Sequence, residues 1–375
     1  MSANLAQRCG ALILGGFSGH SLPADYGTAL GRGRRAGAIL FRRNLSDANQ
    51  ACELTESIRA ASPKGAAPTF VALDQEGGRV RRLGAPLLQL PPMRALASGL
   101  SADELTALAR AVGRELTACG FTLNFAPVLD VDSNPQNPVI GDRACSALPE
   151  QVARLGLAFA SGLLQAGVIP CGKHFPGHGD TASDSHLELP RLPHDLARLR
   201  RLELAPFAAA ARADLPSLMT AHIVFEALDS QRPATLSRAV LTDLLRGELG
   251  YQGVVFTDCL EMQAISDHVE VAEAAVQSVS AGADVVLICH SFERQEAALE
   301  ALIHEAERSP AFAARVQDAA RRSTQLRAAY APHPQNLERR TQLFASHSAW
   351  QRRLDAIAAQ YAAELQGLIS DPTER

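Results

Sequence analysis

The sequence predicts an α/β fold, a single (β/α)8 barrel of the TIM type with a helical extension at its C-terminal end. Three observations predict it. Short apolar runs recur over the first ~300 residues, they are continuous rather than alternating, and helical patterns lie between them, as in parallel sheets buried on both faces. The candidate strands are Ala11–Phe17, Ala36–Phe41, Thr69–Asp74, Leu123–Asp130, Val168–His174, Ser217–Ile223, Gly253–Asp258 and Asp284–Cys289. A doubly wound open sheet is the alternative, but no glycine fingerprint follows the first strand.

The helices are predicted from apolar residues at three- and four-residue spacing. The clearest is Asp103–Cys119, which is preceded by Ser101 with Glu104 three residues later, a capping box. The other helical segments between the predicted strands are Asp47–Ala61, Glu150–Gln165, Asp195–Ala213, Ser237–Leu249 and Val269–Ala281.

The C-terminal part of the chain has no strand signal. Helical spacing covers Phe312–Ala329 and Leu337–Leu368. We therefore divide the chain into a catalytic barrel, residues 1–308, and a helical extension, residues 309–375, packed on the barrel. Four apolar positions on the last helix could instead contact a partner helix, although we expect core packing: Leu354, Ile357, Tyr361 and Leu365.

Composition excludes several classes of protein. A hydrophobic content of 47% with 20% charged residues is normal for a soluble globular protein, and a net charge of −4 without a basic arm gives no reason to expect nucleic acid. No apolar run is long enough to span a membrane, and the N-terminus does not read as a secretory signal. The seven scattered cysteines include no CxxC pair, which favours free thiols in a reducing cytoplasm. We expect a cytoplasmic monomer without cofactor or metal.

Polar groups follow the predicted strands at the ends where a barrel carries its active site. A charged residue at the end of a buried apolar run is costly unless it is paired or used. The residues in question are Asp74, Asp130, Asp132, Lys173, His174, His222 and Asp258.

One fourteen-residue stretch, Lys173–His186, reads KHFPGHGDTASDSH and follows the fifth predicted strand. It holds three histidines, two aspartates and one of only two lysines in the chain, the other being Lys64. Catalytic groups concentrate in loops on rigid scaffolds, so this stretch predicts a functional site.

Carboxylates, imidazoles and one lysine fit some reactions and not others. The sequence has no Gly-x-Ser-x-Gly elbow, no GxxxxGK[ST] phosphate loop and no GxGxxG turn. A carboxylate nucleophile with a separate proton donor suits sugar transfer, for which retaining glycosidases place two such groups about 5 Å apart.

With these residues the chain resembles the glycoside hydrolase family 3 β-N-acetylglucosaminidases of the bacterial NagZ type. The resemblance covers residues 10 to 305 or so, and Lys173–His186 matches the family signature KHFPGHGxxxxDSH. Four further segments stand in the family's order: LDQEGGRV (73–80), NPVIGDR (137–143), MTAHI (219–223) and GVVFTDCLEM (253–262).

The resemblance implies a retaining exo-β-N-acetylglucosaminidase, a β-N-acetylhexosaminidase, that acts on N-acetylglucosaminyl-1,6-anhydro-N-acetylmuramyl peptides in cell-wall recycling. It implies that Asp258 is the nucleophile and His186 the acid/base, with Asp184 as its partner in a dyad. An imidazole suits that role because its pKa lies near neutrality. The implied sugar-binding residues are Asp74, Arg143, Lys173 and His174.

The sequence departs from the family at two places. Cys259 follows the nucleophile position, where Asp or Gly is common, and Ala144 and Cys145 follow Arg143, where an aromatic residue is common at the second position. Neither departure removes a catalytic group, but both could alter the shape of the sugar pocket.

Other functions stay open at this point. They are a β-N-acetylglucosaminide phosphorylase or β-glucosidase of the same family, and a non-catalytic sugar-binding protein. A metal-dependent hydrolase would use a different ligand set: His174, His178, Asp180, Asp184 and His186.

Overall fold

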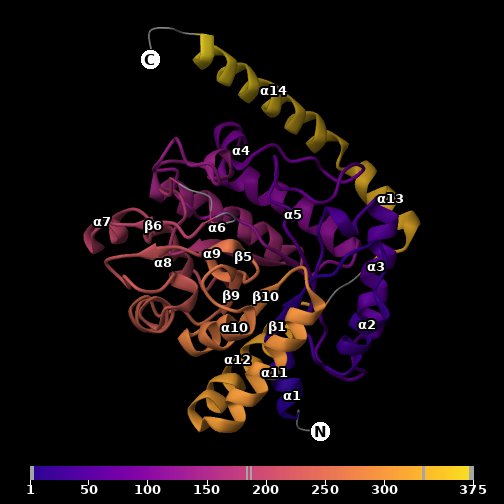
Figure 1. Cartoon of the computed structure of the whole chain (residues 1–375). Helices are drawn as coiled ribbons and strands as arrows, with labels where there is room; N and C mark the ends of the chain where they lie inside the picture. Colours follow the sequence, from indigo (N-terminus) through magenta and orange to yellow (C-terminus); the bar gives the residue numbers. More distant parts are fainter. Residues whose placement is uncertain (1–3, 183–184, 186–187, 332–333, 371–375) are drawn as a thin grey trace.

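A closed barrel of eight parallel strands forms the centre of the molecule (Figure 1). The computed structural model describes residues 4–182, 185, 188–331 and 334–370. Around the barrel the strands follow the order β1-β10-β9-β7-β5-β4-β3-β2. Their bounds are β1 Ile13–Gly15, β2 Gly37–Ile39, β3 Phe70–Leu73, β4 Leu123–Asn124, β5 Ile169–Phe175, β7 Ser217–Thr220, β9 Val254–Cys259 and β10 Val285–Ile288. Each of the eight predicted apolar runs overlaps one of these strands, and β5 and β9 each extend one residue beyond the predicted run, so the predicted barrel is confirmed.

Helices surround the barrel, and several match the predicted segments. The predicted capping box is present, because the Ser101 side chain accepts from the Glu104 amide and Glu104 accepts from the Ser101 amide. The helices at predicted positions are α3 Ala48–Ala61, α5 Ala102–Ala118, α6 Pro149–Gln165, the π-helix η4 Ala239–Glu248, α10 Val271–Ala281 and α12 Pro310–Ala329.

The predicted helix Asp195–Ala213 is wrong as a single element. It is divided into α7 (Leu196–Arg201) and α8 (Ala205–Arg212). Pro206 lies in the first turn of α8 and has no N–H to donate to the preceding turn, so an uninterrupted helix through this position would be strained.

Several elements, most of them short, were not predicted from the sequence. They are α1 Leu5–Gly10, α2 Ala24–Gly31, α4 Met93–Gly99, α9 Gln263–Ser266, α11 Phe292–Arg308, the 3-10 helices η1 Arg42–Asn44, η2 Gly141–Arg143 and η3 Ala234–Leu236, and the parallel pair β6 Arg191–Leu192 and β8 Val224–Phe225. Most are too short for a periodic pattern to identify them.

The inside of the barrel is filled by side chains. Phe256 on β9 meets Phe70 and Phe125 edge to face, each with ring centroids 5.5 Å apart. All three rings are buried, in a cluster that also contains Leu14 and Leu287. The packed interior is typical of this fold and leaves the carboxyl ends of the strands as a rigid rim for functional groups.

Two further helices, α13 (Leu337–Ser346) and α14 (Ser348–Ser370), end the described chain. Leu354 and Ile357 on α14 are buried, and α14 contacts α4, whereas Leu365 is exposed. Figure 1 shows the far end of α14 extending beyond the barrel. The division into residues 1–308 and 309–375 stays a prediction.

Two findings bear on the environment of the protein. Within the described residues no helix combines the length and apolarity that a membrane crossing requires. All seven cysteines are described and none forms a disulfide.

Candidate active site

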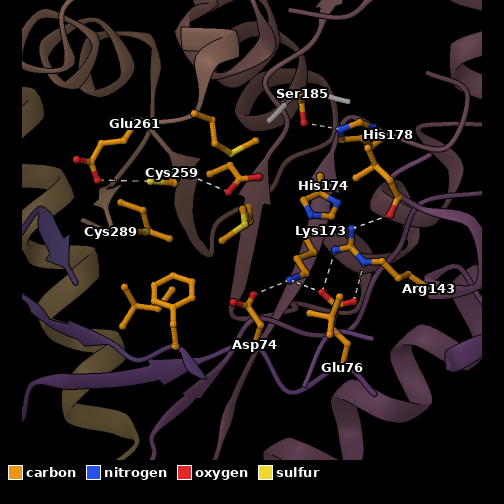
Figure 2. A pocket seen from close by; sticks show the side chains of 18 of the residues that line it. Asp74, Glu76, Arg143, Lys173, His174, His178, Ser185, Cys259, Glu261 and Cys289 are labelled. Carbon is orange, nitrogen blue, oxygen red and sulfur yellow. Dashed lines mark hydrogen bonds and ion pairs between the residues drawn. The ribbon is translucent and has the colours of Figure 1, made fainter. Parts of the chain in front are cut away.

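A cavity of about 510 Å³ opens at the carboxyl ends of the barrel strands. Its size is in the range of pockets that bind small molecules. Figure 2 shows its lining, with Asp74, Glu76, Lys173 and Arg143 on one side, called the charged side, and Cys259, Glu261 and Cys289 on the other. The charged and polar residues that line it include Asp74, Glu76, Arg82, Arg143, Lys173, His174, His178, Ser185, Asp258 and Glu261.

Lys173 is at the centre of the charged side. It extends from β5, and its Nζ lies 2.8 Å from Asp74 Oδ1, just after β3, and 2.6 Å from Glu76 Oε1. Arg82 Nη2 lies 2.9 Å from the other oxygen of Asp74. The lysine side chain is only 3% exposed, so these ion pairs replace the water it would otherwise bind.

The charges on this side stabilise one another. Burial alone would raise the pKa of Asp74, but the Lys173 ammonium and the Arg82 guanidinium hold it well below its usual range. Burial would likewise lower the pKa of Lys173, yet Asp74 and Glu76 raise it above the ordinary value. Both groups are therefore charged at neutral pH, ready for charge-assisted hydrogen bonds.

Arg143 extends the network through Glu76. Its Nε and Nη2 lie 2.9 and 3.0 Å from the two carboxylate oxygens, a bidentate pair. Burial opposes ionisation of Glu76, but Arg143 and then Lys173 lower its pKa to about 2. Arg143 thus lines the cavity and contacts Lys173 through the shared carboxylate of Glu76.

His174, the next residue on β5, is oriented by a buried carboxylate. Asp130 is fully buried, and its Oδ2 lies 2.7 Å from His174 Nδ1. Its Oδ1 accepts the backbone N–H groups of His174 at 3.1 Å and His178 at 2.7 Å. One aspartate therefore fixes the ring of His174 and the start of the loop that follows.

His178 holds that loop together. Its Nδ1 and Nε2 each lie 2.9 Å from a hydroxyl, of Thr181 and Ser185 respectively. Burial, and then the charge of His174, lower the pKa of His178 to about 4, so it is neutral at pH 7. The Asn137 side chain donates to the His178 carbonyl at 2.8 Å, which ties the NPVIGDR segment to the KHFPGHG segment.

Asp258 stands on β9 across the cavity from these groups and is half-buried. Its Oδ1 accepts the N–H of Cys259 at 2.7 Å. The strand end is held by His222, whose Nε2–H donates to the Cys259 carbonyl at 2.9 Å. The predicted dyad residues Asp184 and His186 lie outside the described residues.

The structure brings together Asp74, Arg143, Lys173, His174 and Asp258 around one cavity. Two residues with equally direct contacts, Glu76 and Arg82, were not among the sequence predictions. Glu76 lies in the LDQEGGRV segment, and its position two residues after Asp74 could have indicated that it lines the same site. Nothing in the sequence indicated that Arg82 turns back to Asp74.

The ligand set of a metal-dependent hydrolase is not assembled among its described members. His174 contacts Asp130, His178 contacts two hydroxyls, and Asp180 contacts His194. Within the described part of the chain, two other groups bring three possible metal ligands close together: Cys259, Glu261 and His290, and Asp180, His194 and Glu203.

Carboxylates and a preformed set of charged hydrogen-bonding groups at the mouth of a (β/α)8 barrel define a class of protein, the barrel glycoside hydrolases. The family model for the glycosyl hydrolase family 3 N terminal domain matches residues 27–326. The chain therefore belongs to glycosyl hydrolase family 3.

Three similar proteins place the chain within the family. Beta-hexosaminidase A of Pseudoalteromonas piscicida is 41% identical over 286 residues, 72% of this chain and 48% of that protein. This chain thus spans about half the length of that relative. A glycoside hydrolase family 3 beta-N-acetylglucosaminidase from Paenibacillus sp. str. FPU-7 superposes with a TM-score of 0.85 at 42% identity, over 92% of this chain and 68% of the other. NagZ from Neisseria gonorrhoeae, in complex with N-trifluoroacetyl-D-glucosamine, superposes with a TM-score of 0.75 at 31% identity, over 93% of this chain and 97% of the other.

Proposed function

We propose that the protein is a β-hexosaminidase that works as a retaining exo-β-N-acetylglucosaminidase, with Asp258 as nucleophile and the His186–Asp184 pair as acid/base. The observation that supports this most is the position of Asp258, on β9, in the same cavity as the Asp74–Lys173 ion pair. The similarity to a family 3 beta-N-acetylglucosaminidase and to NagZ in complex with an N-acylated glucosamine supports the choice of sugar.

The proposed reaction has two steps. In the first, Asp258 forms a bond to the anomeric carbon while the glycosidic C–O bond breaks and His186 gives its proton to the leaving oxygen. In the second, neutral His186 takes a proton from water, whose oxygen attacks the same carbon and releases Asp258. Asp184 would hold the imidazole in one orientation and stabilise its protonated form.

The charged side of the cavity would hold the sugar in place. Each oxygen of Asp74 accepts one hydrogen bond in the structure, from Lys173 or Arg82, and a carboxylate oxygen can accept a second. Asp74, Lys173, His174 and Arg143 would therefore bind the ring hydroxyls without any rearrangement of charge. We further propose muropeptides of the 1,6-anhydro type as substrate, and the cytoplasm as location stays a prediction from the sequence.

The nucleophile assignment is tested by Asp258→Asn. We expect kcat on an aryl β-N-acetylglucosaminide to fall by about 10³-fold or more, because the amide cannot form the glycosyl ester. The circular dichroism spectrum and the melting temperature should stay close to those of the wild type. Asp132→Asn, which changes an aspartate that is paired with Arg94 and does not line the cavity, is the matched control. Undiminished turnover in Asp258→Asn would overturn the assignment.

The sugar preference and the acceptor are tested separately. We expect kcat/KM on the aryl β-N-acetylglucosaminide to exceed that on the aryl β-glucoside at pH 7, with no added metal. Equal or reversed preference would contradict the proposed sugar. In phosphate buffer, free N-acetylglucosamine should be the product, and accumulation of its 1-phosphate would show a phosphorylase instead.

A further inference from the structure

A group of thiol, carboxylate and imidazole side chains lies on the side of the cavity opposite Lys173. We call it the thiol cluster: Cys259, Glu261, Cys289 and His290, all of which line the cavity. Cys259 ends β9, and Cys289 and His290 follow β10, the neighbouring strand in the barrel. Figure 2 shows Cys259, Glu261 and Cys289 on this side, away from the charged residues.

Three members of the thiol cluster already have the spacing of a metal site. The Sγ of Cys259, a carboxylate oxygen of Glu261 and a ring nitrogen of His290 all lie within 4.8 Å of one another. Cys259 Sγ is 3.9 Å from Glu261 Oε2. Tetrahedral zinc has Zn–S bonds of about 2.3 Å and Zn–N and Zn–O bonds of about 2.0–2.2 Å, so its ligand atoms lie roughly 3.5–4 Å apart.

Cys289 lines the cavity beside these three ligands without belonging to the group. Its interaction with the Cys259 thiol, and then burial, raise the pKa of Cys289 well above the ordinary value, so this thiol stays protonated. The Arg43 guanidinium interacts electrostatically with both sulfur atoms.

Glu261 is held in position before any ligand arrives. Its Oε2 accepts the backbone N–H of His290 at 2.6 Å and its Oε1 accepts that of Ser291 at 3.0 Å. Its side chain is 5% exposed. His290 is exposed and Cys289 is buried, so the cluster extends from solvent to the cavity wall and gives a cation a path inward.

The second group of possible ligands is a poorer cation site. Arg198 Nη2 lies 3.0 Å from Asp180 and 3.2 Å from Glu203, so a guanidinium compensates both carboxylates at shorter range than Arg294, whose Nη1 lies 3.8 Å from Glu261 in the thiol cluster. That group also offers no sulfur ligand, whereas thiolate and imidazole together favour zinc over magnesium or calcium.

We propose that the thiol cluster binds a thiophilic divalent cation such as Zn²⁺, with Cys259, Glu261 and His290 as ligands. Binding releases the Cys259 thiol proton to solvent. The cation is bound to Cys259, the residue that follows Asp258, on the side of the cavity opposite Lys173. A cation at this position blocks access of the substrate to Asp258. Cation binding itself does not depend on the proposed reaction.

Cobalt(II) is the probe, because a thiolate bound to it gives a charge-transfer band in the near ultraviolet. We expect the band to appear at one equivalent of Co²⁺ and to disappear when Zn²⁺ is added. Cys259→Ser should remove most of the band, and His290→Gln, at an exposed position, should weaken Co²⁺ binding at least about tenfold.

Matched controls come from the chain itself. Cys52 is a buried cysteine outside the cavity lining, so Cys52→Ser should leave the band unchanged. His304 is exposed on α11, so His304→Gln should also have no effect. The absence of a charge-transfer band in the wild type, or a full band in both Cys259→Ser and His290→Gln, would overturn the proposal.

A second measurement tests the blocked access. Zn²⁺ should inhibit turnover of the aryl substrate, and His290→Gln should need at least about tenfold more Zn²⁺ for the same inhibition. Equal inhibition of both proteins would overturn this consequence. The cobalt band requires no turnover, so a failure of the proposed reaction and a failure of cation binding give different results.

Discussion

The two sides of the cavity differ in how their side chains are held. On the charged side, Lys173 contacts Asp74 and Glu76, and each carboxylate contacts an arginine as well. On the side of the thiol cluster, backbone N–H groups hold Glu261, and the contacts between side chains are longer: the Cys259 thiol lies 3.9 Å from Glu261, and His290 stacks on Phe41 with ring centroids 6.2 Å apart.

The difference indicates that the two sides of the cavity have different roles in recognising the substrate. Charged groups that are fixed before a ligand binds recognise it without the cost of reorganisation, so the charged side should determine which sugar binds. Aromatic and sulfur-containing side chains adapt to ligands of different shape, so the other side should tolerate different leaving groups. The predictions below test this difference in roles.

The largest effect is expected at Lys173. In Lys173→Met the carboxylates of Asp74 and Glu76 lose their shared cation while both remain buried. We expect kcat/KM to fall by about 10³-fold and the free energy of unfolding to fall by about 3 kcal/mol. Steady-state kinetics and urea denaturation measure the two effects.

The control for this variant is Lys64→Met, which changes the only other lysine, at an exposed position. It should match the wild type in both measurements. If Lys173→Met kept kcat/KM within tenfold of the wild type, the charged side would not determine sugar binding.

A pH effect of intermediate size is expected at His178. Burial lowers its pKa to about 4 from the ordinary 6.5, so the unfolded chain takes up the proton first as the pH falls. The contribution of neutral His178 to stability is therefore complete above about pH 6.5 and is lost between pH 6.5 and 4, by about 3 kcal/mol in total. Urea denaturation at several pH values between 7 and 4 measures it.

Replacing the titrating group should flatten this pH dependence. Glutamine cannot titrate, so His178→Gln should be less stable than the wild type at pH 7 but lose less stability on acidification. His20→Gln, at an exposed histidine, should keep the wild-type slope. An unchanged slope in His178→Gln would show that His178 is not the group responsible.

Much of the charged side could be predicted from the sequence, because strand ends in a barrel meet at one rim. Asp74, Lys173 and Asp258 each follow or end an apolar run, and that rule places them together. The motif resemblance added Arg143. The rule does not predict Arg82, which lies eight residues after Asp74 in an irregular turn and contacts it there.

The thiol cluster could not be predicted, because it depends on the register between two neighbouring strands. Cys259 and Cys289 are thirty residues apart, and their contact depends on how β9 and β10 align. The pairing is Val285 with Phe256 and Leu287 with Cys259, so the register shifts by one residue between the two pairs. An irregularity of that kind has no signature in an apolar run, so only the structure shows that the two cysteines line the same cavity.

The smallest effect is expected at Phe41, on the side of the thiol cluster. Its ring stacks on His290 with an interplanar angle of 19°, and the Arg43 guanidinium lies 4.4 Å from the ring centroid. Phe41→Ala removes an aromatic surface worth about 1 kcal/mol, so kcat/KM should fall only about three- to tenfold. The loss should be larger for a disaccharide substrate than for an aryl glycoside, because we expect the leaving group to lie against this side.

The matched control is Leu337→Ala, which removes an exposed apolar side chain on α13, distant in the chain from the cavity residues. It should leave both substrates unaffected. A loss above about hundredfold in Phe41→Ala, equal for both substrates, would place Phe41 among the residues that hold the reacting sugar. The two sides of the cavity would then share recognition of that sugar, and tolerance of different leaving groups would need another origin.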